Sequence, residues 1–311
     1  MNFAIAKRAP ERTRMLGLSL IELMAALTIG LLLIAGAFTV YMQSRNTYRT
    51  TDTAARMQET ARYAFDILEP DVRLAGYWGM KKGPYAVTDT IVGTDVGNNC
   101  GGNGWMGDAT KYITGFDGEG TVTSWGGMGC GPTGRNAWSD VLIVRRASAE
   151  PSALDLNKVQ VHSNRAQATV FSSASAPGGY GSWPAAETRD MICNVYYIGT
   201  DNGQPALRRI GLRGKQMVDD PVIPGVQDMQ VQYGVDTNAD GAADKYVNAD
   251  AIGAAAVVAA RIWLLVRAES EEQGYTNSTN YRYANADIAA ANDKRRRILM
   301  SKTIRIRNAQ S

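Results

Sequence analysis

Residues Leu18 to Met42 form an apolar run of 25 residues that contains one charged side chain, that of Glu22. A helix of about 20 apolar residues is long enough to cross the hydrocarbon core of a bilayer. A carboxylate at the centre of such a helix costs about 3 kcal/mol or more, so charged residues in these segments have a function or a partner. The run therefore predicts a membrane-spanning helix, and Glu22 needs an explanation of its own.

Positive charge is concentrated before this run. The first 17 residues contain four basic side chains and one acidic one, which together carry the whole formal charge of +3; these are Lys7, Arg8, Arg12, Arg14 and Glu11. The rest of the chain is balanced, with 29 basic and 29 acidic residues. Basic residues that flank a membrane helix remain in the cytoplasm. We therefore expect a cytoplasmic N-terminus, an exported body, and no direct nucleic-acid partner, since the body has no basic excess.

Three kinds of N-terminal segment fit this pattern. A secretory signal could be cut after the small residues Ala35–Ala37, which would leave Phe38 as the first residue. A plain signal anchor would keep Met1. In both cases the carboxylate of Glu22 interrupts a core that such segments keep apolar, and neither accounts for it.

The third kind is carried by the sequence KRAPERTRMLGLSLIELM, which resembles the class III signal of type IV pilins and type II secretion pseudopilins. That signal combines a basic leader, a Gly, an apolar run, and a Glu five residues after the Gly. The resemblance implies that prepilin peptidase cuts after Gly17, that Leu18 becomes the N-methylated first residue, and that Glu22 meets the N-terminal amine of a neighbouring subunit. Pairing offsets the cost of burying each charge alone and sets the axial register between subunits. The alternative is a Glu22 that reaches the membrane interface.

The helix is expected to continue well beyond the membrane segment. The chain from Met42 has no Gly or Pro until Pro70, and apolar or small residues recur at helical spacing. These are Ala54, Met57, Ala61, Ala64, Phe65, Leu68 and Val72. We predict a leader peptide over 1–17, a helix over 18–75 with its membrane or filament-core segment at 18–42, a kink or end at Pro70, and release of the chain at Gly76.

The remaining residues, 76–311, predict a β-rich head. Runs of β-branched residues indicate strands at Asp140–Ala147 and Met191–Gly199, and the segment ALRRIGL is expected to pair with the second of these. Later strands are expected in GVQDMQVQYGVD, AARIWLLVRAES and RRRILMSKTIRIRN. Together these segments suggest one mainly antiparallel sheet. The predicted fold class is α+β and pilin-like, with a long N-terminal helix, half membrane-spanning and half amphipathic, packed on that sheet.

The order of these segments is similar to that of PilW-type minor pilins. The similarity is carried by DVRLAGYWG after the helix, then GVQDMQVQYGVDTNADGAADKYV, ARIWLLVRAES and the closing IRIRN. It implies a structural protein of the inner membrane with a periplasmic head, which joins a complex that initiates or tips a type IV pilus at the cell surface. The implied partners are prepilin peptidase, the major and other minor pilins, and the inner-membrane assembly platform. A J-class pseudopilin of type II secretion is the second choice, and a periplasmic binding or enzymatic domain on an unrelated anchor is the third.

Two groups of residues could hold the head together or bind an ion. Cys100 and Cys130 both lie in Gly-rich sequence and are the candidate disulfide, with Cys193 buried and unpaired. Asp236, Asn238, Asp240 and Asp244 occupy the first, third, fifth and ninth places of an EF-hand-like loop, with Gly241 at the sharp turn. Val247 stands at the twelfth place, where a bidentate Glu is usual. The loop predicts either a Ca²⁺ site or a hairpin turn rich in Asp, Asn and Gly.

No pattern in the sequence predicts catalysis. The only histidine, His162, has no accompanying GxSxG motif, and the chain has no Walker A loop and no HExxH helix. We expect His162 to be a residue of a sheet, and the chain not to be an enzyme.

Overall fold

The structure is a computed structural model and describes residues 17, 19–83, 86–91, 96, 100, 104–118, 128, 131, 134–181 and 185–309. The chain forms two compact units, Met1–Asp52 and Thr53–Ser311. A single helix, α1 (Leu20–Arg73), supplies most of the described part of the first unit. Its last turns belong to the second unit, together with all the strands.

Helix α1 runs for 54 residues, close to the expected range of 18–75. In the second unit its buried side chains recur every three or four residues, as predicted. They are Met57, Ala61, Ala64, Phe65, Leu68, Asp71 and Val72. Pro70 lies in the last turn, where it lacks the N–H that would bond the Asp66 carbonyl, and the helix ends three residues later with the Leu74 N–H bonded to the Pro70 carbonyl at 3.1 Å. Gly76 then takes a φ of 72°, which favours glycine and turns the chain away.

The larger of the two main sheets is organised around one long strand, β6. Its eight strands are β1 (Val87–Asp89), β2 (Ile113–Phe116), β3 (Val141–Pro151), β4 (Gln160–Ser163), β5 (Ala168–Phe171), β6 (Glu187–Asp201), β7 (Gln204–Arg213) and β8 (Gln216–Pro224). Strand β6 pairs with β3 along one edge and with β4 and then β7 along the other. Every pair is antiparallel except β1 with β5.

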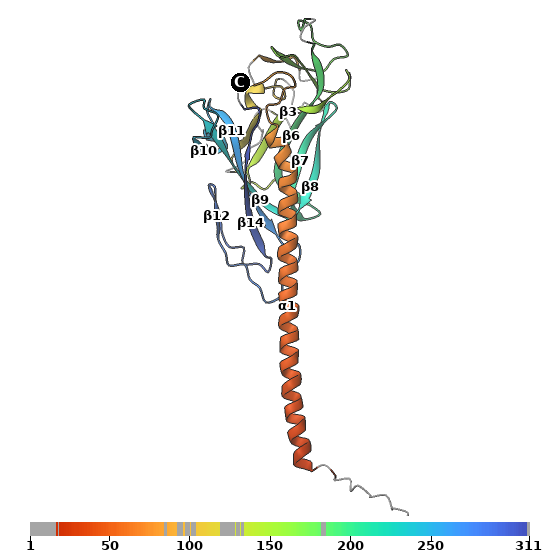
Figure 1. Ribbon diagram of the computed structural model, residues 1–311, viewed down its shortest axis with the longest axis vertical. Helices are drawn as coiled ribbons and strands as arrows, with labels where there is room; N and C mark the ends of the chain where they lie inside the picture. Colours follow the sequence, from red (N-terminus) through yellow and green to blue (C-terminus); the bar gives the residue numbers. More distant parts are fainter. Residues whose placement is uncertain are drawn as a thin grey trace, which may run out of the picture. The chain divides into compact units, whose positions relative to one another are not determined.

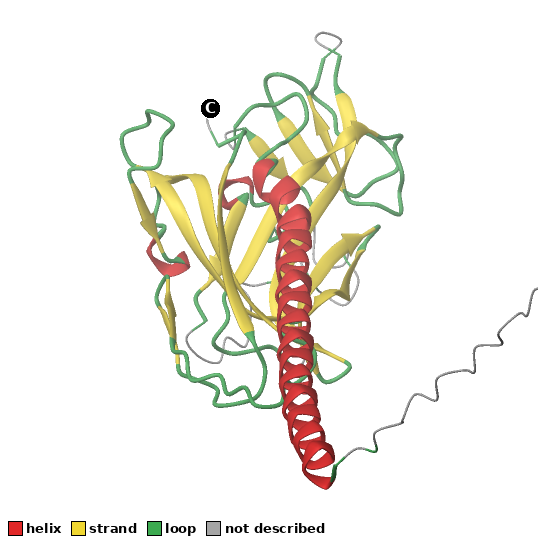
Figure 2. Ribbon diagram, turned by 60° about the horizontal axis from the view of Figure 1, so that its bottom comes forward, coloured by secondary structure: helices red, strands yellow, loops and turns green. Residues whose placement is uncertain are grey.

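The second main sheet contains the C-terminal strands, in the order β10-β9-β11-β14. Its strands are β9 (Val226–Asp236), β10 (Lys245–Val247), β11 (Ala256–Arg267) and β14 (Arg297–Arg305), all antiparallel. A separate hairpin, β12 (Tyr281–Tyr283) with β13 (Ala286–Ile288), and two short 3₁₀ helices, η2 (Ala109–Lys111) and η3 (Ala249–Ala251), complete the described elements. Figures 1 and 2 show the two sheets beside the last turns of α1.

The strands were expected to form one sheet, and that part of the prediction is wrong, because they divide into two main sheets and β3 does not pair with β9. Asp140, just before β3, accepts hydrogen bonds from the backbone N–H groups of Gly118 and Val231, both at 2.8 Å. The Asp140 N–H in turn donates to the Met229 carbonyl at 2.9 Å. The buried carboxyl group and the backbone N–H of Asp140 thus join the two sheets, although their strands do not pair.

One hydrophobic core serves both sheets and the helix. It contains the apolar face of α1 together with buried residues of β3, β6, β9 and β11. Trp78, Tyr196, Tyr197 and Tyr233 are among its largest fully buried side chains. Burying this area removes apolar surface from water, which is the main term that favours folding of the second unit.

Candidate functional site

The first part of α1 is apolar on every side. Its large hydrophobic side chains from Leu20 to Met42 are all exposed, between 37% and 78%. The helix is long and apolar enough to cross a membrane, and no part of its most hydrophobic window is buried by the protein. A helix that is hydrophobic all round is buried in lipid or among other helices. This segment is therefore a surface that requires an apolar environment, consistent with a membrane anchor.

The single carboxylate of this surface, Glu22, lies in the first turn of α1 and is exposed. Its backbone N–H donates to the Ser19 hydroxyl at 3.2 Å, and the N–H of Leu23 donates to the Ser19 carbonyl at 3.1 Å. Ser19 therefore caps the helix, and the carboxylate stands near the positive end of the helix dipole. The sequence interpretation missed this role of Ser19, although the spacing Ser-x-x-Glu is a known signature of a helix start.

The residues of the predicted processing site lie just before this cap. Gly17 is exposed, and no other atom lies within 4 Å of the place where a side chain would begin. Leu18 lies outside the described residues. Cleavage after Gly17 and methylation of Leu18 therefore stay predictions.

The other end of α1 is held to the larger sheet by Asp71, which is 5% exposed. One of its oxygens accepts two hydrogen bonds from Arg146 on β3, at 3.0 and 2.6 Å. The other accepts from the Asn194 amide at 2.5 Å and the Tyr196 hydroxyl at 2.6 Å, both on β6. Charge-assisted bonds of this kind are about twice as strong as neutral ones. We call these four residues the Asp71 cluster.

A second contact joins the same part of the helix to the C-terminal sheet. Lys302 on β14 donates to Glu69 at 2.5 Å, and Arg73 lies 3.4 Å from the same carboxylate. The hydrogen bond from Lys302 lowers the pKa of Glu69, whose side chain is 27% exposed. The last two turns of α1 therefore contact both sheets.

The cysteines are partly placed by the structure. Cys193 on β6 is a free thiol and fully buried, and this burial raises its pKa to about 11. Cys100 is buried and disulfide-bonded. Its predicted partner, Cys130, lies outside the described residues, so the pairing stays a prediction.

The acidic loop predicted for Ca²⁺ connects β9 to β10 and is closed by its own hydrogen bonds. Asp236 accepts from the backbone N–H groups of Asn238, Ala239 and Gly241, at 3.2, 2.7 and 2.7 Å. Asp244 accepts from the N–H and the hydroxyl of Thr237 at 2.7 and 2.6 Å.

The other two predicted ligands contact each other, since the Asn238 amide donates to Asp240 at 3.1 Å. Across the described part of the chain, no three His, Cys, Asp or Glu side chains form a group that could hold a metal. This arrangement has the bonds of the hairpin-turn alternative. The Ca²⁺ prediction stays a prediction, and thermal unfolding with and without millimolar Ca²⁺ tests it, because an ion that binds only the folded form raises the melting temperature.

His162 lies on β4, as expected of a sheet residue. Its Nδ1 is 2.8 Å from the Thr188 hydroxyl on β6, and its ring packs edge-on against Tyr180. Burial lowers its pKa. These contacts give the imidazole a packing role.

Comparison with known families adds evidence at the C-terminal end of the chain. Residues 195–308, about a third of the chain, match a family model described as Type IV Pilus-assembly protein W. Over this segment the resemblance to PilW-type proteins is confirmed. The match begins within β6 and includes β7 to β14, with the acidic loop. A family of pilus-assembly proteins also agrees with the prediction that the chain is not an enzyme.

Other comparisons add less. No curated protein matches the chain. A solved structure, a type IV-like pilin from Thermus thermophilus, aligns with 82% of this chain and 98% of its own, at 11% identity and a TM-score of 0.36.

Proposed function

We propose that this chain is a minor pilin that helps to initiate or tip a type IV pilus. Prepilin peptidase cuts the precursor after Gly17, and Leu18 becomes the N-methylated first residue. The protein is then held in the inner membrane by its apolar helix, with the head in the periplasm, until the assembly platform transfers it to the filament. The observation that carries this proposal is an all-round apolar helix with one carboxylate in its first turn, on a chain whose last strands match PilW.

The proposed role of Glu22 follows from the cost of burying charge. In a filament the apolar helices pack together without water, and a free N-terminal ammonium or a carboxylate would each be strongly unfavourable alone. Glu22 lies four residues after Leu18 and has no other charged residue nearby in the apolar run. It is therefore the group available to pair with the amine of a neighbouring subunit, and this pairing fixes the axial position of the incoming chain. The size of the head, 76–311, is proposed to restrict the protein to the filament end.

Two measurements test this function. The intact mass and N-terminal sequence of the mature protein are expected to show N-methyl-Leu18, whereas Phe38 would indicate a secretory signal and Met1 a plain anchor. In cells, Glu22→Ala is expected to be cleaved normally but absent from sheared pili. The matched control is Glu59→Ala, an exposed glutamate of the same helix outside the apolar run. Normal incorporation of the Glu22 variant would contradict the proposed role.

The alternative is a minor pseudopilin of a type II secretion system. It shares the processing site and the proposed role of Glu22, so the N-terminal measurement does not separate the two. A deletion strain does: loss of surface pili with normal secretion supports the pilus, and the reverse supports the secretion system.

A further inference from the structure

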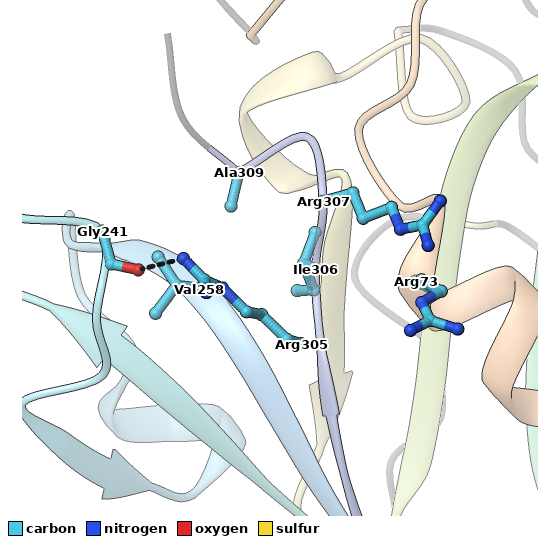
Figure 3. A pocket seen from close by; sticks show the side chains of 7 residues that line it. All are labelled: Arg73, Gly241, Val258, Arg305, Ile306, Arg307 and Ala309. Atoms are coloured by element: carbon cyan, nitrogen blue, oxygen red, sulfur yellow. Dashed lines mark hydrogen bonds between the residues drawn. The ribbon is translucent and has the colours of Figure 1, made fainter.

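A recess at the end of β14 is lined by three arginines that have few partners. It has a volume of about 330 Å³ and lies entirely within the second unit. Arg73 comes from the last turn of α1, while Arg305 and Arg307 come from the end of β14 and the chain that follows it (Figure 3). We call this site the arginine recess.

The backbone around the recess is fixed by hydrogen bonds. The N–H of Ile306 donates to the Val258 carbonyl on β11 at 2.9 Å, and the N–H of Arg307 donates to the Arg73 carbonyl at 3.0 Å. The side chains of Val258, Ile306 and Ala309 are 3–6% exposed and supply an apolar floor. The chain beyond β14 is thus bonded to β11 on one side and to the end of α1 on the other. The arginines of the recess are therefore attached to a fixed backbone.

The positive charge of the recess is poorly balanced. None of the described residues that line it is acidic. Arg305 donates to the Gly241 carbonyl at 3.3 Å, and Arg73 lies 3.4 Å from Glu69, a carboxylate that it shares with Lys302. Within the described residues the Arg307 side chain makes no hydrogen bond or ion pair. Each guanidinium has five N–H donors, so most of the donors around this recess are available to an anionic ligand.

The arrangement of the arginines indicates the shape of that ligand. Figure 3 shows Arg305 directed toward Gly241 on one side of Ile306, and Arg73 and Arg307 together on the other side. A single small anion on one side of Ile306 would leave the charge on the other side unbalanced. Two carboxylates separated by an apolar residue would reach both sides and cover the apolar floor between them.

We propose that the arginine recess binds an acidic segment of a partner protein, with two carboxylate side chains on either side of an apolar one. The inference extends the proposed function, because in a pilin such a segment would belong to another subunit of the assembly. Guanidinium groups bind carboxylates through paired N–H bonds, and the complementary charge also speeds association. The recess thus adds a site on the head to the contacts proposed for the apolar helix.

A peptide-binding assay on the detergent-solubilised full chain tests the proposal. The probe is a fluorescent peptide that contains two Glu-Leu-Glu repeats. Its binding is measured at low salt by the increase in fluorescence anisotropy. Binding of the peptide is expected to weaken at least tenfold in the double variant Arg305→Gln/Arg307→Gln. The single variant Arg307→Gln is expected to weaken it by a smaller factor. The control Arg282→Gln removes an exposed arginine from β12, paired with Asp287 at 3.0 Å, and is expected to bind as the wild type does.

Each contrary result overturns the proposal in a different way. A Gln-Leu-Gln peptide that binds equally well would exclude a role for the carboxylates. Inorganic phosphate that displaces the peptide at equal concentration would indicate a site for small anions only. No binding, or equal binding by the double variant with an unchanged melting temperature, would exclude the site. The assay involves no filament, so it is independent of the proposed function. If the peptide does not bind but Glu22→Ala still abolishes incorporation into pili, only the proposed role of the arginine recess is refuted. If the peptide binds but Glu22→Ala is incorporated normally, only the proposed function is refuted.

Discussion

Removal of the Asp71 carboxylate is expected to destabilise the head strongly, because it leaves the largely buried side chain of Arg146 without its counter-ion. The side chain of Arg146 is 12% exposed, and both of its bonds to Asp71 go to one oxygen. Breaking a buried ion pair by removing one partner costs about 3–5 kcal/mol. Asp71→Ala also removes the acceptor of Asn194 and Tyr196, so we expect a loss of about 4 kcal/mol in the free energy of unfolding.

The same argument predicts a partial rescue. Arg146→Met in the Asp71→Ala background removes the uncompensated charge and fills a similar volume. We expect this second substitution to restore about 2 kcal/mol of the free energy of unfolding. For a domain of this size about 1 kcal/mol corresponds to 2–4 °C in melting temperature, so Asp71→Ala alone should melt about 8–16 °C below the wild type. The matched control is Asp66→Ala, an exposed acid on the same helix, which is expected to change stability by less than about 0.5 kcal/mol.

Urea unfolding of the full chain in detergent, followed by the fluorescence of its six tryptophans, measures these differences. The membrane segment contains no tryptophan, so the signal reports the head. The reasoning is refuted if Asp71→Ala costs less than about 1 kcal/mol or if Arg146→Met makes the double variant less stable still. Either result would mean that the ion pair is accessible to water or replaceable by neighbouring groups.

Three further results are expected. Burial raises the pKa of Asp140 to about 8, far above its unfolded value near 3.8, so the native state retains a proton that the unfolded chain releases. The urea midpoint of unfolding should therefore fall as the pH rises from about 4 to about 8. It should fall less steeply in Asp140→Asn, which cannot release that proton. In Gly115→Ala the new methyl would lie 2.2 Å from the Val141 carbonyl and the Tyr233 hydroxyl, and calorimetry should show a loss of about 2–3 kcal/mol. Lys302→Met, which keeps the stem but removes the half-exposed charge near Glu69, should lower the free energy of unfolding by at most about 1 kcal/mol in the same calorimetry. A flat pH profile, a neutral Gly115 variant or a large Lys302 effect would contradict the respective argument.

The helix could be predicted from the sequence because its signals are local. Six of the seven small or apolar positions expected on its inner face are buried, and only Ala54 remains half-exposed. The helical period is visible within any two turns of chain, and Pro70 and Gly76 mark its end. The strands around Cys193, Met229 and Leu264 were also placed correctly, since their β-branched runs are long and lie between turn residues.

The sheet division and the Asp71 cluster could not be predicted, because their signals are not local. Alternation along a strand shows which residues share a face but not which strand is the neighbour. Asp71 resembles the exposed Asp66 in sequence, yet its partners come from β3 and β6, between 75 and 125 residues along the chain. The same applies to Asp140, whose bonds connect two sheets. Buried polar residues that join distant elements become visible only when those elements are brought together.

The buried thiol of Cys193 can report local unfolding of the head, because it reacts only when it becomes accessible. It lies on β6 between β3 and β7, fully enclosed, with a pKa raised to about 11. An alkylating reagent needs an accessible thiolate, so it reacts only after the central strand separates from its neighbours. The rate at which this one sulfur is modified therefore measures how often the head opens around β6.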